Sequence, residues 1–189
     1  MTSAAVEHSS EAGVPDSEFQ IIEMRVHREE AGRRVLRRLG FADRVFAGIG
    51  GNAELREVSL YYKPYYFTLC LQSKRFGIKR FEEAEIYVSV DGLSGVASVY
   101  REQPDWVGAT RAELPADATA LAPTVTPADA VQKTDRRRAH LQVRHKCSVS
   151  TLWEEPLLVH KPIWLVTVAG KRRDKRYAVD AYTGYVLQE

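Results

Sequence analysis

The chain has 189 residues, of which 44% are hydrophobic and 28% charged, with a net charge of +2. Such a composition is ordinary for a soluble globular protein of one or two domains, and so small a net charge does not by itself indicate a nucleic-acid or membrane partner. No apolar run approaches the length of a membrane span, and the N-terminus lacks a basic leader followed by an apolar stretch. Cys70 and Cys147 form neither a C-x-x-C pair nor a disulfide framework. We therefore expect a cytoplasmic protein without membrane contact.

Two segments have too few hydrophobic residues to form a core. Residues 1–17 are small and polar and contain no Lys or Arg, so we expect a mobile tail. The stretch Gln103–Asp129 is rich in Ala, Thr and Pro, which is typical of a linker. We place the linker itself at 103–125, between a first unit at 18–102 and a second at 126–189.

The first unit is predicted to begin with a helix and continue with strands. Over His27–Leu39 the apolar residues recur at helical spacing while the arginines occupy the other face. Four segments rich in Val, Tyr, Phe and Thr follow, separated by turn residues, and are predicted to be strands: 54–62, 64–76, 80–90 and 95–100.

The second unit repeats this order. Thr126 is a helix cap with Pro127 at the first helical position, and a helix is predicted over 127–141. Predicted strands follow at 149–159, 162–170, 176–181 and 184–189. Lys63-Pro64 in the first unit corresponds to Lys161-Pro162 in the second, which indicates an internal duplication.

The duplication predicts an α+β fold of two repeats, each a helix packed on a three- or four-stranded antiparallel sheet. We expect a core formed by the apolar residues of the helices and strands: Val35, Leu36, Leu39, Leu60, Tyr66, Leu69, Val88, Val90, Trp164, Val166, Tyr177 and Val179.

A short motif occurs twice, as YVSVDGLSGV at 87–96 and YAVDAYTGYV at 177–186. In D-x-x-[ST]-G, Asp91 and Asp180 can accept hydrogen bonds from backbone N–H groups two or three residues later. Gly95 and Gly184 can take a positive φ, which allows a tight return to the next strand. An aspartic-protease site would need the acid next to the hydroxyl residue, and a calcium loop would need more oxygen ligands. The motif therefore predicts two structural turns.

These features together resemble the PepSY domain. The resemblance is carried by Pro64-Tyr65-Tyr66 with Asp91 and Gly95, and by Pro162-Ile163-Trp164 with Asp180 and Gly184. It covers about 18–100 and 126–189. The resemblance implies a non-catalytic module, a helix against an antiparallel sheet, that binds or restrains a partner protein.

The first unit has the longer hairpin, KRFGIKRF at 74–81, in which basic and aromatic residues alternate. We predict that this hairpin contacts a partner through five side chains: Lys74, Arg75, Phe76, Lys79 and Phe81. Single-stranded nucleic acid is an alternative ligand, because rings stack on bases and cations meet phosphates. A plain solvated turn is the other alternative. We expect deletion of 75–79 to preserve folding and abolish partner binding.

Three basic clusters support nucleic-acid binding as an alternative function: Arg33, Arg34, Arg37 and Arg38, then Arg136–Arg138, then Lys171–Arg176. No recognition helix or RNA-stacking motif accompanies them, so a solvated surface also explains these charges. The spacing of His140, His145 and Cys147 fits no common zinc pattern, so we expect no metal and no cofactor.

The leading hypothesis is therefore a non-catalytic protein-binding or regulatory module with an unidentified protein partner, and not an enzyme. Nucleic-acid binding is the alternative, and an enzyme of unidentified type is third. Open sheet edges also offer a route to homo-oligomers.

Overall fold

The computed structural model describes residues 19–39, 54–76, 80–110, 113–170 and 173–188. Across these residues ten strands form one mixed sheet, and two helices pack on it. The predicted tail, residues 1–17, lies outside the described residues.

The main path of the sheet runs in the order β10-β9-β8-β2-β3-β4, with every neighbouring pair antiparallel. β1 and β6 add in parallel to β8 and β2, β7 pairs antiparallel with β2, and β5 pairs antiparallel with β1. The elements in chain order are β1 Phe19–Ile22, α1 Arg28–Arg38, β2 Leu55–Phe76, β3 Arg80–Asp91, β4 Ala97–Tyr100, β5 Trp106–Ala109, β6 Ala118–Ala120, α3 Pro127–His145, β7 Ser148–Thr151, β8 Leu157–Val168, β9 Lys175–Asp180 and β10 Val186–Gln188.

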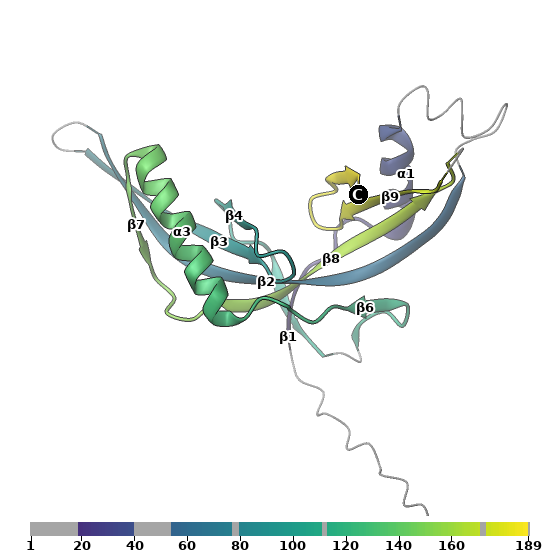
Figure 1. Ribbon diagram of the computed structural model, residues 1–189, viewed down its shortest axis with the longest axis horizontal. Helices are drawn as coiled ribbons and strands as arrows, with labels where there is room; N and C mark the ends of the chain where they lie inside the picture. Colours follow the sequence, from purple (N-terminus) through teal and green to yellow (C-terminus); the bar gives the residue numbers. More distant parts are fainter. Residues whose placement is uncertain (1–18, 40–53, 77–79, 111–112, 171–172, 189) are drawn as a thin grey trace, which may run out of the picture.

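The two central strands, β2 and β8, pair along most of β8, with Lys63 opposite Lys161. Figure 1 shows both strands curving along the length of the molecule, with α3 near one end and α1 near the other. The predicted strands at 54–62 and 64–76 are thus one continuous strand that passes through Pro64.

The central strands tolerate proline because of the direction in which its backbone points. The carbonyl of Pro64 accepts a hydrogen bond from the N–H of Gly92, and the carbonyl of Pro162 accepts one from Ala181. In a strand the N–H and C=O of one residue point to the same side, so both prolines point away from the β2–β8 ladder. Their missing N–H groups therefore remove no hydrogen bond between the two central strands.

The prediction of two repeats, each with a helix on its own three- or four-stranded sheet, is wrong. The strands of both halves form a single sheet, because β2 and β8 pair with each other and so satisfy edges that two separate sheets would leave open. The helices also pack across the halves: α1 packs on β8, β9 and β10 as well as on β2, and α3 packs on β3 and β4 as well as on β7. Each helix therefore covers strands from both halves of the chain.

The segment predicted as a linker, 103–125, contributes β5 and β6 to the sheet. Both strands are short, and each pairs with a strand from the first half of the chain. The segment is thus part of the sheet where it is described.

The core lies in clusters on both faces of the sheet. On one face of β2, Leu60 and Tyr62 pack under α1, while Tyr66 and Cys70 pack under α3. The opposite face of β2 carries Phe67, which packs in an aromatic cluster without helix cover. All the predicted core residues are buried except Leu36 and Leu69, which are partly buried.

Both predicted helices are confirmed. α1 spans Arg28–Arg38 with acidic residues in its first turn and basic residues in its last, an arrangement that suits the helix dipole. α3 begins at Pro127, with the Thr126 hydroxyl accepting a hydrogen bond from the N–H of Asp129, and continues to His145. Neither of these two helices has both the length and the apolar composition needed to cross a bilayer.

Candidate functional site

The two D-x-x-[ST]-G motifs form turns with matching hydrogen bonds. One carboxylate oxygen of Asp91 accepts from the N–H groups of Leu93 (2.9 Å) and Ser94 (3.2 Å). In the same way Asp180 accepts from Tyr182 (3.0 Å) and Thr183 (3.1 Å). Gly95 and Gly184 have φ values of 70° and 75°, the left-handed conformation that the motif predicts.

The second carboxylate oxygen of each aspartate binds a lysine at the centre of the sheet. Lys63 Nζ lies 2.6 Å from Asp91, and Lys161 Nζ lies 2.5 Å from Asp180. Burial by itself would raise the pKa of Asp91, but the hydrogen bond from Lys63 and those from the turn N–H groups outweigh it and lower this pKa. Both acids are thus engaged in holding turns to central strands, which is a structural role.

Tyr65 lies beside these lysines on the face that the helices leave uncovered. The Nζ atoms of Lys63 and Lys161 lie 5.7 Å and 5.9 Å from its ring centre. Burial, with a smaller effect from Asp91, raises the pKa of Tyr65, so its hydroxyl stays protonated. A neutral phenol between two ion pairs carries out no evident chemistry.

A different region offers space for a ligand. A groove of about 420 Å³ lies between the C-terminal half of α3 and the β2–β3 hairpin. We call it the α3–hairpin groove. It is lined by eleven residues from α3, β2, β3, β4 and the residue after β4: Gln72, Lys74, Glu82, Ala84, Glu85, Ile86, Val99, Arg101, Arg137, Leu141 and His145.

α3 presents one stripe of side chains to this groove, at a spacing of four residues: Arg137, Leu141 and His145. Leu141 is buried against Cys70 and Ile86, which fixes the helix against the sheet. The neighbouring Arg138 and Gln142 donate hydrogen bonds to the carbonyl of Val149 at 2.9 Å and 3.2 Å. The wall formed by α3 is therefore held rigidly in place.

Two arginines of the groove carry polar groups without a partner among the described residues. The Nε atom of Arg137 is buried and has no hydrogen-bond partner among the described residues. Arg101 is exposed and forms no ion pair with any described residue. At the other end of the groove, Lys74 lies opposite Glu82 in the β2–β3 ladder. Since an unpaired buried polar group is costly, the region around Arg137 favours an acceptor supplied from outside.

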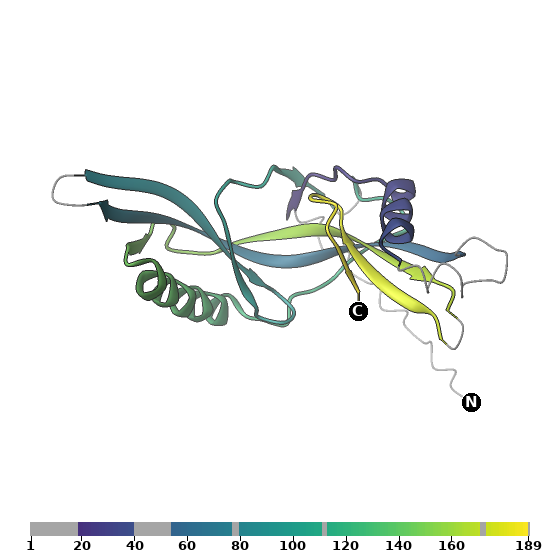
Figure 2. The ribbon, with the colours of Figure 1, turned by 90° about the horizontal axis from the view of Figure 1, so that it is seen from above.

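The groove also runs along an open edge of the sheet. β4 pairs with β3 only over Tyr87–Val90, although β3 begins at Arg80. No described strand pairs with the outer edge of β3 before Tyr87. Figure 2 shows the β2–β3 hairpin extending beyond the end of α3. The N–H of Asp91 donates to the carbonyl of Val96 on this outer side of β3. The backbone N–H and C=O groups of successive strand residues point to alternate sides, so those of every second residue before Asp91, including Glu85 and Glu83, also point outward.

Of the five residues predicted to contact a partner, Lys74 lines the groove. Arg75, Phe76 and Phe81 belong to β2 and β3, but their side chains lie outside the described part of the structure. Lys79 lies outside the described residues altogether. The prediction for these four therefore stays a prediction.

Sequence reasoning did not identify Arg101, Leu141 or the role of Arg137. The spacing of Arg137, Leu141 and His145 was a usable signal, because it places an arginine and a histidine on the same stripe as a core leucine. Arg101 had no such signal, since only the pairing of β4 with β3 brings it to the groove.

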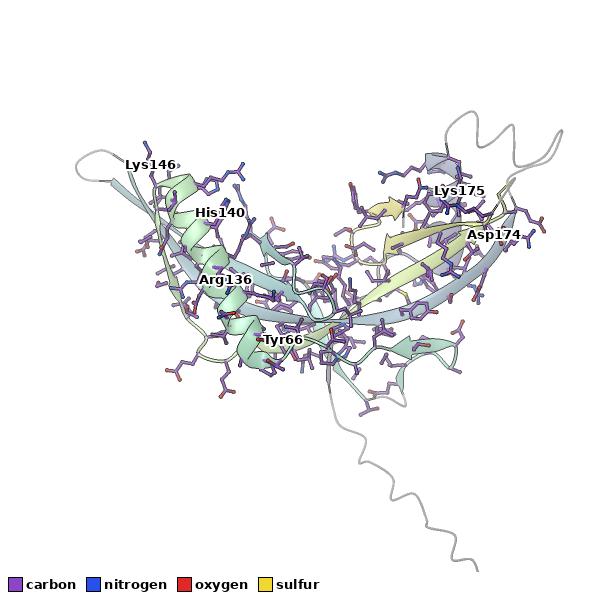
Figure 3. All side chains as sticks on the ribbon, viewed as in Figure 1. Tyr66, Arg136, His140, Lys146, Asp174 and Lys175 are labelled. Atoms are coloured by element: carbon purple, nitrogen blue, oxygen red, sulfur yellow. The ribbon has the colours of Figure 1, made fainter. Side chains whose placement is uncertain are left out.

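Several residues of the basic clusters make structural contacts. Arg34 pairs with Glu30 (2.6 Å) and donates to the carbonyl of Gly184 (3.3 Å), and Arg38 donates to the carbonyl of Val186. Figure 3 shows Arg136 and His140 along α3, with Lys146 beyond its end. Lys171 and Arg172 lie outside the described residues.

The described residues contain no cluster of three or more His, Cys, Asp or Glu side chains that could hold a metal ion. Cys147 instead accepts a hydrogen bond from the Gln72 amide at 3.2 Å. Comparisons of the chain with family models, curated proteins and solved structures found no match.

Proposed function

We propose that the protein is a non-catalytic binding module that holds a partner protein in the α3–hairpin groove. The observation that carries this proposal is the buried, unpartnered Nε of Arg137 in a groove beside the open edge of β3. A partner that supplies an acceptor to Arg137 and backbone groups to β3 would satisfy both at once. The resemblance of the turn motifs to PepSY domains agrees with a role in binding a partner.

Nucleic-acid binding is less well supported by the contacts. Arg34 donates to a backbone carbonyl in the turn before β10, and Arg38 and Arg138 donate to carbonyls in β10 and β7, so all three are engaged in holding helices to the sheet. A phosphate-binding surface needs cations that are free to reach a backbone of regularly spaced charges.

Site-specific photo-crosslinking in extracts of the native cell tests the proposal. A photoreactive residue replaces His145, which lines the groove, or His140, which is exposed on the same helix but does not line it. We expect a crosslinked protein from position 145 and not from position 140, and we expect Arg137→Glu to abolish it. Equal crosslinking from both positions, or a product unaffected by Arg137→Glu, would contradict the proposal.

A further inference from the structure

We infer that the partner enters the α3–hairpin groove as an extended segment that adds to the outer edge of β3 and carries alternating acidic and basic side chains. This inference rests on the proposed function and specifies the chemistry of the occupant.

Among the described residues, the first part of β3 has no neighbouring strand on its outer side. β4 stops at Tyr100, whereas its neighbour β3 continues past Tyr87 to Arg80. An added strand would therefore lie on the line of β4, beyond its end, and beside Glu83 and Glu85. The outward N–H and C=O groups of those two residues are the donors and acceptors that an antiparallel or parallel neighbour uses.

On the face toward α3, arginine side chains lie near this edge. Arg101 lies in the bend directly after β4 and lines the groove together with Val99, which packs in the core cluster beneath α3. Arg137 and His145 reach the same space from the helix. The acid on this face, Glu82, lines the hairpin end of the groove, where it lies opposite Lys74 in the β2–β3 ladder. Side chains of an added strand that point toward α3 would thus meet cationic groups and a buried donor, which favours carboxylates there.

On the opposite face, the same edge carries acidic side chains. Glu83 and Glu85 are exposed, and alternation from Tyr87, which packs in the aromatic cluster without helix cover, places their side chains on the side that α3 does not cover. Glu85 also borders the groove, because it lies at the edge of β3. Side chains of an added strand that point to this side would lie beside two carboxylates, which favours Lys or Arg. Because side chains of a strand alternate between faces, the two preferences together require alternating charge along the segment.

A second copy of this chain does not meet that requirement. Two β3 edges placed side by side in antiparallel orientation would bring the acidic run Glu82, Glu83 and Glu85 of one copy against the same run of the other. Like charges directly opposite destabilise a strand pair, so the edge disfavours pairing with itself.

Two synthetic peptides of equal length and composition test the inference. In one, Glu and Lys alternate, and in the other the same residues form an acidic block followed by a basic block. Fluorescence anisotropy with the full chain should show the alternating peptide binding about tenfold or more tightly than the block peptide. Hydrogen exchange should show slower exchange of the Glu83 and Glu85 amides when the alternating peptide is bound.

A pair of variants at one position separates the backbone from the charge. Glu83→Pro removes an N–H that points outward and is not used by the β2–β3 ladder, so the hairpin should still form. Glu83→Gln keeps the N–H and removes only the charge. We expect the alternating peptide to bind Glu83→Pro about tenfold or more weakly than Glu83→Gln, as the loss of an edge hydrogen bond and the added ring would produce.

Three results would overturn strand addition: equal affinity for both peptides, no binding of either peptide, or parental affinity in Glu83→Pro. Should Glu83→Pro fail to fold, the hydrogen-exchange measurement on the parent decides, and unprotected amides at 83 and 85 overturn the inference. A crosslinked partner that is lost in Arg137→Glu but retained in Glu83→Pro would overturn strand addition and leave the proposed function standing.

Discussion

Replacing Gly184 by alanine should destabilise the protein more than the same change at Gly95. Both glycines have positive φ, where an L-residue costs about 1–2 kcal/mol. They differ in what an added Cβ would meet. At Gly184 it would lie 1.9 Å from Arg34 Nη1, and at Gly95 it would lie 2.5 Å from Lys133 Cε.

The difference depends on how firmly each cation is held. Arg34 is bound to Glu30 and donates to the carbonyl of Gly184, so moving it breaks a partly buried hydrogen bond worth about 0.5–1.5 kcal/mol. No hydrogen bond or ion pair of Lys133 with the described residues is present to hold its flexible chain, so Lys133 can move aside. We therefore expect about 2–3 kcal/mol for Gly184→Ala and about 1–2 kcal/mol for Gly95→Ala.

A double-mutant cycle that combines Gly184→Ala with Arg34→Ala isolates the part of the destabilisation that comes from the close approach of Arg34. In the Arg34→Ala background only the cost of positive φ remains, so Gly184→Ala should cost about 1–2 kcal/mol there, and the coupling should be about 0.5–1.5 kcal/mol. Urea denaturation followed by circular dichroism measures all four free energies of unfolding. If Gly184→Ala costs the same in both backgrounds, the close approach of Arg34 is not what makes the position demanding. If neither glycine variant is destabilised, the assignment of the two motifs as structural turns is wrong.

Three further predictions concern titration and ligand choice. The folded-state pKa of Asp91 lies below its unfolded value, so its ion pair with Lys63 contributes stability above about pH 4 that is lost as the pH falls further. Denaturation midpoints over a pH series should therefore decline less in Asp91→Asn than in the parent, and parallel curves would contradict this. Burial lowers the pKa of His160, so the folded protein favours the neutral imidazole. The contribution of His160 to the free energy of unfolding is therefore complete above about pH 6.5 and decreases as the pH falls. In His160→Gln the denaturation midpoint should fall less steeply with decreasing pH just below about pH 6.5 than in the parent. An unchanged slope would show that another group titrates there. Single- and double-stranded oligonucleotides should not bind with the steep salt dependence of phosphate recognition, and a linear fall of log affinity with log salt concentration would instead favour the nucleic-acid alternative.

Local chemistry in the sequence was sufficient for the helices and the turns. Thr126 and Pro127 mark the start of α3 because a cap and a preset φ act within one turn of the chain. The hydrogen bonds of Asp91 and Asp180 likewise span two or three residues, so the motif carries all the information that the turn needs. The alternating strands were also evident, since one face of each had to be buried.

Only the tertiary structure decided how these elements combine. The pattern around Pro64 predicted the start of a strand, whereas the structure runs β2 through it, because the side on which its missing N–H falls depends on which neighbours pair there. The apolar stripe of α1 indicates that one face is buried, but it does not indicate that the strands beneath are β2, β8, β9 and β10. The groove follows from the same non-local choices: Arg101, Arg137 and the free edge of β3 are distant in sequence and meet only because α3 packs on strands from the first half of the chain. Strand partners and helix positions are set by contacts between remote residues, and no short segment of sequence specifies them.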